Sequence, residues 1–89
     1  MEIIKKSGRV EEFNPSKVKN SVFYASEEVK EPLTDSDLKL IEKEVIDILK
    51  HLGREKTSAY EVFAIVLNVL KKLEFNRIGR SYLEGSIKF

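Results

Sequence analysis

The chain contains no cysteine and only one histidine, His51. The absence of thiols excludes disulfides, thiolate nucleophiles and cysteine-based zinc sites. A single histidine cannot form a metal site without help from carboxylates. The chain also lacks the glycine-rich loop ending in Gly-Lys-Ser that marks many nucleotide hydrolases. Because no catalytic constellation is present, we expect a protein that is not an enzyme.

Long apolar runs and an excess of charge of one sign are also missing. No stretch approaches the roughly 18 apolar residues of a membrane span, and the first residues lack the apolar segment of a signal peptide. Lys and Arg number 16 against 15 Asp and Glu, so the overall charge does not direct the chain to DNA or to an anionic membrane. We therefore expect a soluble, cytoplasmic protein with neither a membrane nor nucleic acid as a partner.

The composition is sufficient for one domain over residues 1–89. Hydrophobic residues make up 42% of the chain and charged residues 35%, which suits a packed core beneath a well-solvated surface.

The first residues predict a β-hairpin. Two short segments within residues 2–13 flank Ser7-Gly8, and Gly8 supplies the positive φ of a two-residue turn. Pairing Lys6 with Arg9 across this turn fixes which side chains share a face. One face would carry Ile4, Glu11 and Phe13, and the other would carry Ile3, Lys5, Val10 and Glu12.

Two helices are predicted in the first half of the chain. The first begins at Asn14-Pro15, where asparagine caps free N–H groups and proline loses no needed donor, and it runs to Glu28. The second follows a Thr34-Asp37 capping box and ends at Gly53. Its apolar residues alternate three- and four-residue steps: Leu38, Ile41, Val45, Ile48 and Leu52.

Two more helices complete the predicted fold. The third begins at Ser58 and Glu61, a second capping box, and is apolar nearly all round, as expected of a helix inside a bundle. The fourth carries Phe75, Ile78 and Tyr82 at helical intervals. We predict an α+β fold, mostly α, in which an N-terminal β-hairpin caps a bundle of about four helices. Residues 54–57 are a candidate third strand, which would make the cap a three-stranded sheet.

Cations and hydrogen-bonding side chains gather in the hairpin and at the start of the first helix. They are Lys5, Lys6, Gly8, Arg9, Glu11, Asn14 and Lys17. A polyphosphate needs cations from different elements and donors of preset geometry, and a helix N-terminus adds unpaired N–H groups. The pattern indicates a phosphate site, with Ile3, Phe13 and Val18 beside it as an apolar slot for a base. Glu11 would accept hydrogen bonds from ribose hydroxyls or an exocyclic amine.

Each of these residues also has a structural interpretation. Lysines on a hairpin often only solubilise an edge strand, which applies to Lys5 and Lys6. Asn14 can serve as a cap alone, and Glu11 can simply pair with a lysine across the hairpin. Lys17 can cover apolar surface with its stem. Composition does not decide between the two interpretations.

The segment from Lys5 to Val18 resembles the opening motif of ATP-cone domains, in which two basic residues precede Asp-Gly-Arg. The resemblance continues more weakly through an acidic amphipathic helix, a Thr-Ser opening to an apolar helix, and Arg80 and Tyr82 near the end. ATP-cones are regulatory domains that bind ATP or dATP, as at the N-terminus of ribonucleotide reductases and in the repressor of their genes.

The resemblance implies a non-catalytic domain that binds ATP or dATP, with Mg²⁺, as an allosteric ligand. The domain would control its own association or a partner such as a ribonucleotide reductase or its regulator. By motif position, Lys5 and Lys6 would contact the phosphates. Glu11 and Lys17 would complete the nucleotide pocket and Asn14 would shape it. The third and fourth helices would add contacts from Thr57 or Ser58, Glu61 and Lys88.

Two departures from the family pattern keep alternatives open. Lys6 stands where arginine is commoner, which loses a bidentate donor, and Ser7 replaces the usual aspartate of the turn. Ser58 and Glu61 are also explained as a cap and its capping-box partner. One alternative is a cone without nucleotide binding that acts as an interaction module through Phe23, Tyr24 or Phe89. The other is a nucleic-acid-binding module that uses the basic hairpin.

Overall fold

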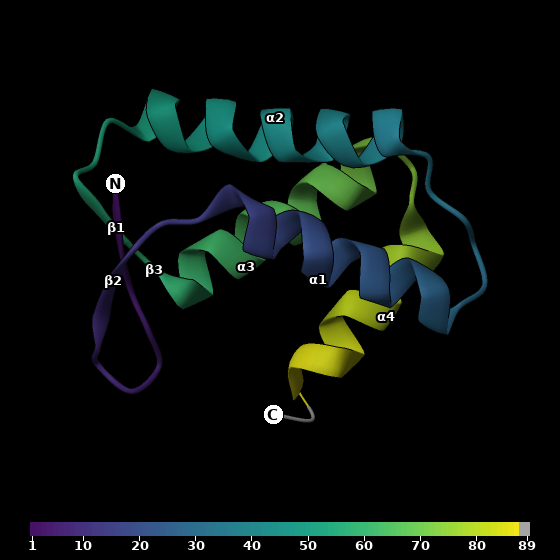
Figure 1. Ribbon diagram of the computed structural model, residues 1–89, viewed down its shortest axis with the longest axis horizontal. Helices are drawn as coiled ribbons and strands as arrows, with labels where there is room; N and C mark the ends of the chain where they lie inside the picture. The colour runs from purple at the N-terminus through teal and green to yellow at the C-terminus, as the bar shows by residue number, and fades with distance from the viewer. Residues whose placement is uncertain (88–89) are drawn as a thin grey trace.

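In the computed structural model, which describes residues 1–87, three short strands and four helices follow one another along the chain (Figure 1). The strands are β1 (Glu2–Ile4), β2 (Val10–Glu12) and β3 (Lys56–Ser58). The helices are α1 (Pro15–Glu28), α2 (Asp35–Leu52), α3 (Ala59–Lys72) and α4 (Asn76–Ile87). The predicted α+β, mostly helical fold is confirmed, in its three-stranded form. Lys88 and Phe89 lie outside the described residues.

The sheet has the strand order β2-β1-β3, with β1 antiparallel to β2 and parallel to β3. A parallel pair needs a long crossover connection, and here β2, α1 and α2 provide it. The third strand expected at residues 54–57 is present, displaced to Lys56–Ser58. The sheet lies at the end of the bundle where α1 and α3 begin and α2 ends (Figure 1).

The hairpin register differs from the prediction by one residue. Ile4 pairs with Val10 and Ile3 with Glu11, so Lys5 rather than Lys6 faces Arg9. The turn therefore contains three residues, ending at Gly8 with a φ of 88°, as in hairpins that close with a bulge at a left-handed glycine. This slip moves all side chains of one strand to the other face. The half-buried face carries Met1, Ile3, Lys5, Glu11 and Phe13.

The N-caps predicted for the first two helices are confirmed. The Asn14 side chain accepts a hydrogen bond from the Ser16 N–H at 3.0 Å, with proline at the first helical position. Thr34 and Asp37 form a complete capping box. Because local sequence satisfies the orphan N–H groups at these ends, both helices begin where predicted.

The buried stripe of α2 corrects one detail of the sequence analysis. Leu38, Ile41 and Val45 are buried as expected, but the next buried residue is Leu49, and Leu52 is 42% exposed. Alternating three- and four-residue steps average 3.5 residues, whereas an α-helix has 3.6 per turn. The predicted stripe therefore drifts around the helix away from the core, so Ile48 is half-buried and Leu49 is buried in its place.

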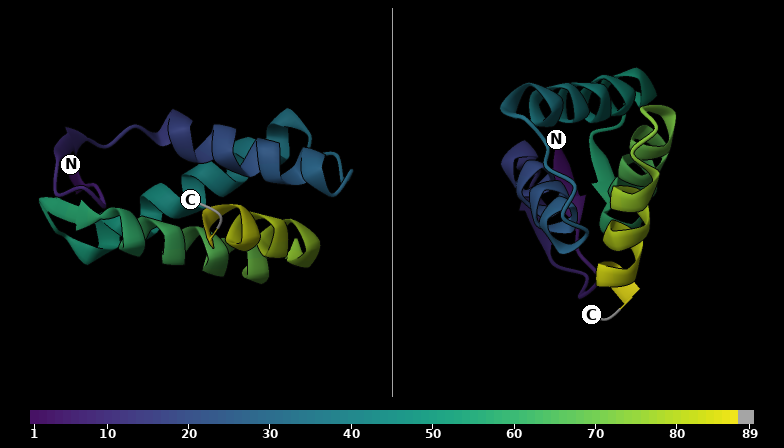
Figure 2. Two further views of the ribbon diagram at one scale, coloured as in Figure 1. Left: turned by 90° about the horizontal axis from the view of Figure 1, so that it is seen from below. Right: turned by 90° about the vertical axis from the view of Figure 1, so that its right-hand side faces the viewer.

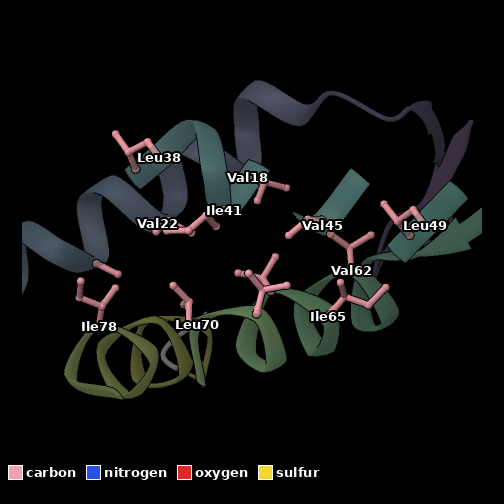
Figure 3. Packing of buried hydrophobic residues seen from close by; sticks show 13 residues of the cluster. Val18, Val22, Leu38, Ile41, Val45, Leu49, Val62, Ile65, Leu70 and Ile78 are labelled. Carbon is pink, nitrogen blue, oxygen red and sulfur yellow. The ribbon is translucent and has the colours of Figure 1, made fainter. Parts of the chain in front are cut away.

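Each helix packs against two others: α1 contacts α2 and α4, and α3 contacts α2 and α4. Figure 2 shows this arrangement from below and along the bundle. Side chains from all four helices meet in one core, shown close up in Figure 3. The most deeply buried apolar side chains are Val22, Ile41, Val45, Val66, Val69, Leu70 and Ile78. Within residues 1–87, no helix combines the length and the apolar character needed to span a bilayer.

Candidate functional site

The three-residue turn determines which basic residues of the hairpin lie opposite each other. The Lys5 N–H donates to the Arg9 carbonyl at 2.8 Å, and the Gly8 N–H donates to the Lys5 carbonyl at 2.9 Å. Lys6 and Ser7 occupy the turn itself. Lys5 and Arg9 therefore stand opposite each other where the strands end, close to Glu11 on β2.

Three cations surround the carboxylate of Glu11. Arg9 Nη2 lies 2.7 Å from Oε1, and the Nζ atoms of Lys17 and Lys5 lie 3.6 Å and 3.8 Å from Oε2. Partial burial raises the pKa of Glu11, but the charges of Lys17, Arg9 and Lys5 and the Arg9 hydrogen bond outweigh it, so the pKa is lowered overall. The two residues that flank the turn, strand β2 and helix α1 thus contribute charges to one cluster.

An inner pocket of about 120 Å³ lies between this cluster and the bundle. Its apolar side includes Phe13, Val18, Val62, Phe63 and Tyr82, and its polar side includes Lys5, Glu11, Asn14 and Lys17. The rings of Phe63 and Tyr82 stack with centroids 5.2 Å apart, and burial raises the pKa of the Tyr82 hydroxyl. An aromatic floor with a charged rim suits a flat heterocycle that carries a polar substituent.

An outer recess of about 420 Å³ adjoins the inner pocket. Lys5, Lys6, Ser7, Arg9, Glu11 and Ala59 line it, and three of them, Lys5, Glu11 and Ala59, also line the inner pocket. The Lys6 Nζ lies over the Tyr60 ring at 5.7 Å from its centroid, a cation–π distance. The two hollows share a border of three residues, and together they form a depression that is apolar at its inner end and cationic at its outer end.

Most residues of the predicted pocket come together in this depression. Lys5, Glu11, Asn14 and Lys17 line the inner pocket, and Lys6 lines the outer recess. The expected apolar slot of Ile3, Phe13 and Val18 is part of it as well.

A second group of predicted residues forms a hydrogen-bond cluster at the junction of β3 and α3. The Ser58 Oγ accepts from the Glu61 N–H at 3.0 Å, so Ser58 caps α3. The Glu61 carboxylate does not close a capping box but accepts from Thr57 Oγ1 at 2.7 Å and from Arg54. The Thr57 hydrogen bond lowers the pKa of Glu61; partial desolvation opposes this, and Arg54 adds to the lowering. These residues do not line either recess, and Lys88 lies outside the described residues.

Sequence reasoning missed the part of the pocket that the bundle supplies. The helical pattern accounts for Tyr82 as a core residue of the fourth helix and does not single out Phe63. These two residues lie 19 positions apart in the chain and meet at the pocket floor. Ala59 contributes through its place at the first turn of α3. The signal available was the aromatic pair itself, but only the crossing of α3 and α4 shows which way it faces.

Comparison with known proteins settles the family. A sequence model of the ATP cone domain matches residues 1–85. The chain belongs to the ATP-cone family. The predicted family is thereby confirmed, and the matched range includes both recesses and the β3–α3 junction.

Similar proteins include three described as the transcriptional repressor NrdR. The one from Arthrobacter sp. (strain FB24) is 36% identical over 72 residues, which is 81% of this chain and 42% of the repressor. The one from Sulfurihydrogenibium sp. (strain YO3AOP1) is 34% identical over 74 residues, 83% of this chain and 48% of the repressor. The one from Pseudarthrobacter chlorophenolicus is 34% identical over 74 residues, covering 83% and 43%. This ATP-cone spans less than half the length of these relatives.

These relatives correct one expectation. Nucleic acid was set aside as a partner because the net charge of the chain is +1, but the similar proteins are repressors of transcription, which act on DNA. The expectation is wrong because net charge describes the long-range field of these 89 residues only, and the relatives are more than twice as long as the matched region. The ATP-cone family and the repressors together support a regulatory role based on nucleotide sensing.

Proposed function

We propose that this ATP-cone binds ATP or dATP in the depression and acts as a non-catalytic allosteric switch. The observation that carries the proposal is the junction of an apolar inner pocket with a cationic outer recess through Lys5, Glu11 and Ala59. A nucleotide has the same polarity along its length, from an apolar base through a sugar to charged phosphates.

We place each part of the nucleotide along this depression. The base enters the inner pocket beside Phe13 and the stacked rings of Phe63 and Tyr82. The phosphates lie in the outer recess, where Lys5 and Lys6 donate charged hydrogen bonds. Lys17 reaches the boundary from α1, and Asn14 shapes the wall while it caps that helix. The sugar lies at the junction, next to Glu11.

Mg²⁺ would be bound through the phosphates of the nucleotide and not in a metal site formed by the protein. In the described part of the chain, no three or more acidic or histidine side chains form a group that could hold a metal ion. The phosphate oxygens would therefore supply most of the ligands, as is usual for Mg²⁺ bound with nucleotides.

The β3–α3 junction is a further part of the proposal. Thr57, Ser58 and Glu61 are close in sequence to Ala59, which lines the outer recess, and to Tyr60, whose ring lies under the Lys6 Nζ. A nucleotide that draws Arg54 or Glu61 away from their present pairing would link the pocket to the start of α3. We keep this group and Lys88 as predicted nucleotide contacts.

Regulation needs two states that the ligands stabilise differently. The similarity to transcriptional repressors favours a partner in the control of gene expression, including DNA reached through a larger assembly. Self-association or contact with a ribonucleotide reductase would serve the same purpose. Light scattering with ATP and with dATP tests for a switch within this chain, since equal masses under all conditions would exclude one.

Calorimetric titration with ATP, dATP, ADP and GTP tests nucleotide binding. We expect adenine triphosphates to bind best, and Lys17→Met to weaken them about tenfold or more, since a hydrogen bond to a charged group contributes about 1.5–3 kcal/mol. Lys39→Met is the matched control, because Lys39 pairs with Asp35 on the exposed side of α2. No binding of any nucleotide by the folded protein would refute the proposal.

Incubation with ATP and Mg²⁺ tests the non-catalytic part. We expect no phosphate release above that of the buffer. Turnover that disappears in the Lys17→Met protein would show that the domain is an enzyme, because a contaminating hydrolase would not follow the mutation.

A further inference from the structure

Glu11 occupies the position in the cation cluster that an anionic ligand would take. Its carboxylate contacts Arg9 through one oxygen and Lys5 and Lys17 through the other. Its side chain is only 25% exposed, whereas those of Arg9 and Lys17 are 74% and 65% exposed. The acidic group therefore lies inside the cluster and the cations surround it.

We propose that Glu11 is an internal counter-anion of the phosphate site, which a polyphosphate must displace from Lys5, Arg9 and Lys17 in order to bind. This inference rests on the proposed function only in requiring that the ligand carry phosphate groups. Glu11 would thereby lower the affinity of the site for phosphate, in addition to any contact with the sugar.

The consequence for selectivity follows from charge. A monovalent anion that replaces Glu11 exchanges one negative charge for another and gains little. A triphosphate brings several charges and engages all three cations at once, and its gain exceeds the loss of the internal pairs. The carboxylate thus reserves the cluster for polyvalent ligands and keeps binding readily reversible, as a sensor of concentration requires.

Lys6 provides an internal contrast. In the part of the chain that the structure describes, it forms no ion pair with Glu11; its Nζ lies over the Tyr60 ring instead. Removing Glu11 should therefore change the availability of Lys5, Arg9 and Lys17 but not that of Lys6.

Binding of inorganic triphosphate, which has neither base nor sugar, tests the proposal. We expect Glu11→Gln to bind it roughly tenfold more tightly than the unmodified protein, because three surface ion pairs no longer compete. Glu11→Asp keeps the charge and should stay within about threefold of the unmodified protein. Glu2→Gln is the matched control, since it removes the same charge from the exposed face of the same sheet, and it should change the affinity by less than about twofold.

Double variants separate release of cations from a general change in charge. In a Lys17→Met background the gain from Glu11→Gln should shrink, whereas in a Lys6→Met background it should persist. Far-ultraviolet circular dichroism establishes that each variant is folded. Equal or weaker binding of triphosphate by folded Glu11→Gln would overturn the proposal. Glu11 would then hold the cations in position for the ligand and would not compete with the ligand for them. An equal gain from Glu2→Gln would also overturn it.

The two proposals fail in different ways. If Glu11→Gln gains affinity for inorganic triphosphate but the unmodified protein does not distinguish ATP from GTP, the counter-anion is supported and adenine recognition is refuted. If ATP binding is specific but Glu11→Gln gains no affinity for inorganic triphosphate, only the counter-anion proposal is refuted. If neither protein binds triphosphate in any form, both are refuted.

Discussion

Replacing Gly79 with alanine should stabilise the domain, although Gly79 lies within α4 against the core. Its N–H donates to the Phe75 carbonyl at 2.9 Å, so the residue is part of the helix. A Cβ added there would lie 3.7 Å from the Leu70 Cβ, an ordinary van der Waals contact. The new methyl group therefore fits without displacing either helix.

The expected gain in the free energy of unfolding has two sources: the unfolded chain loses conformational freedom, and alanine is more favourable than glycine in a helix. Glycine in a helix interior is less favourable than alanine by about 0.5–1 kcal/mol. For a domain of this size, 1 kcal/mol corresponds to a shift in Tm of about 4–8 °C. Thermal unfolding followed by circular dichroism should therefore show Gly79→Ala melting several degrees higher than the unmodified protein.

Two other glycines calibrate this result. The methyl group of Gly85→Ala meets no atom within 4 Å, but Gly85 lies nearer the end of α4 and its replacement should give a smaller gain in stability. Gly53 has a φ of 64° at the left-handed C-cap of α2, so Gly53→Ala should destabilise by about 1 kcal/mol. A lower Tm for Gly79→Ala would refute the reasoning and would mean that α3 and α4 pack too tightly to admit a methyl group.

Three further predictions concern the stability of the fold. Ile41→Ala should cost about 2–5 kcal/mol in urea unfolding, because Ile41 is 1% exposed in the core; a loss below about 1 kcal/mol would mean that the core collapses around the cavity. Thr34→Ala should cost about 1 kcal/mol, because it removes the N-cap of α2, and Thr34→Ser, which retains the hydroxyl, should restore most of this. Glu11 and Glu61 both have a pKa below the ordinary value of 4.5, so the folded state binds fewer protons than the unfolded state in acid. The Tm should be insensitive to these groups above about pH 4.5 and should fall as the pH drops through their folded pKa values. Glu61→Gln should reduce this fall in Tm. A Tm that rises on acidification would contradict the prediction.

The candidate site could be predicted from sequence where one segment supplies the chemistry. Glu11, Asn14 and Lys17 follow one another closely along the chain, so a strand followed by a helix brings them together whatever the register. The predicted turn is one residue too short, which shifts the predicted register by one residue. The reason is that the Ser7-Gly8 pair is compatible with both a two-residue turn and a three-residue turn that ends in a glycine bulge. That difference decides whether Lys5 or Lys6 shares a face with Glu11.

The nature of the partners could not be predicted from charge. A net charge of +1 describes how weakly these 89 residues are steered by a distant polyanion. It carries no information on what a longer protein containing such a domain contacts, and the likeness to transcriptional repressors was needed to correct the expectation.

The starts of α1 and α2, the glycine of the turn and the cations around it follow from short stretches of sequence. These features depend on hydrogen bonds and backbone preferences between residues a few positions apart, which the unfolded chain already encodes locally. The hairpin register, the parallel pairing of β1 with β3, and the meeting of Phe63 and Tyr82 beneath the basic cluster depend on the complete fold. Those contacts join residues far apart in the chain, and their geometry is set by how four helices share one core.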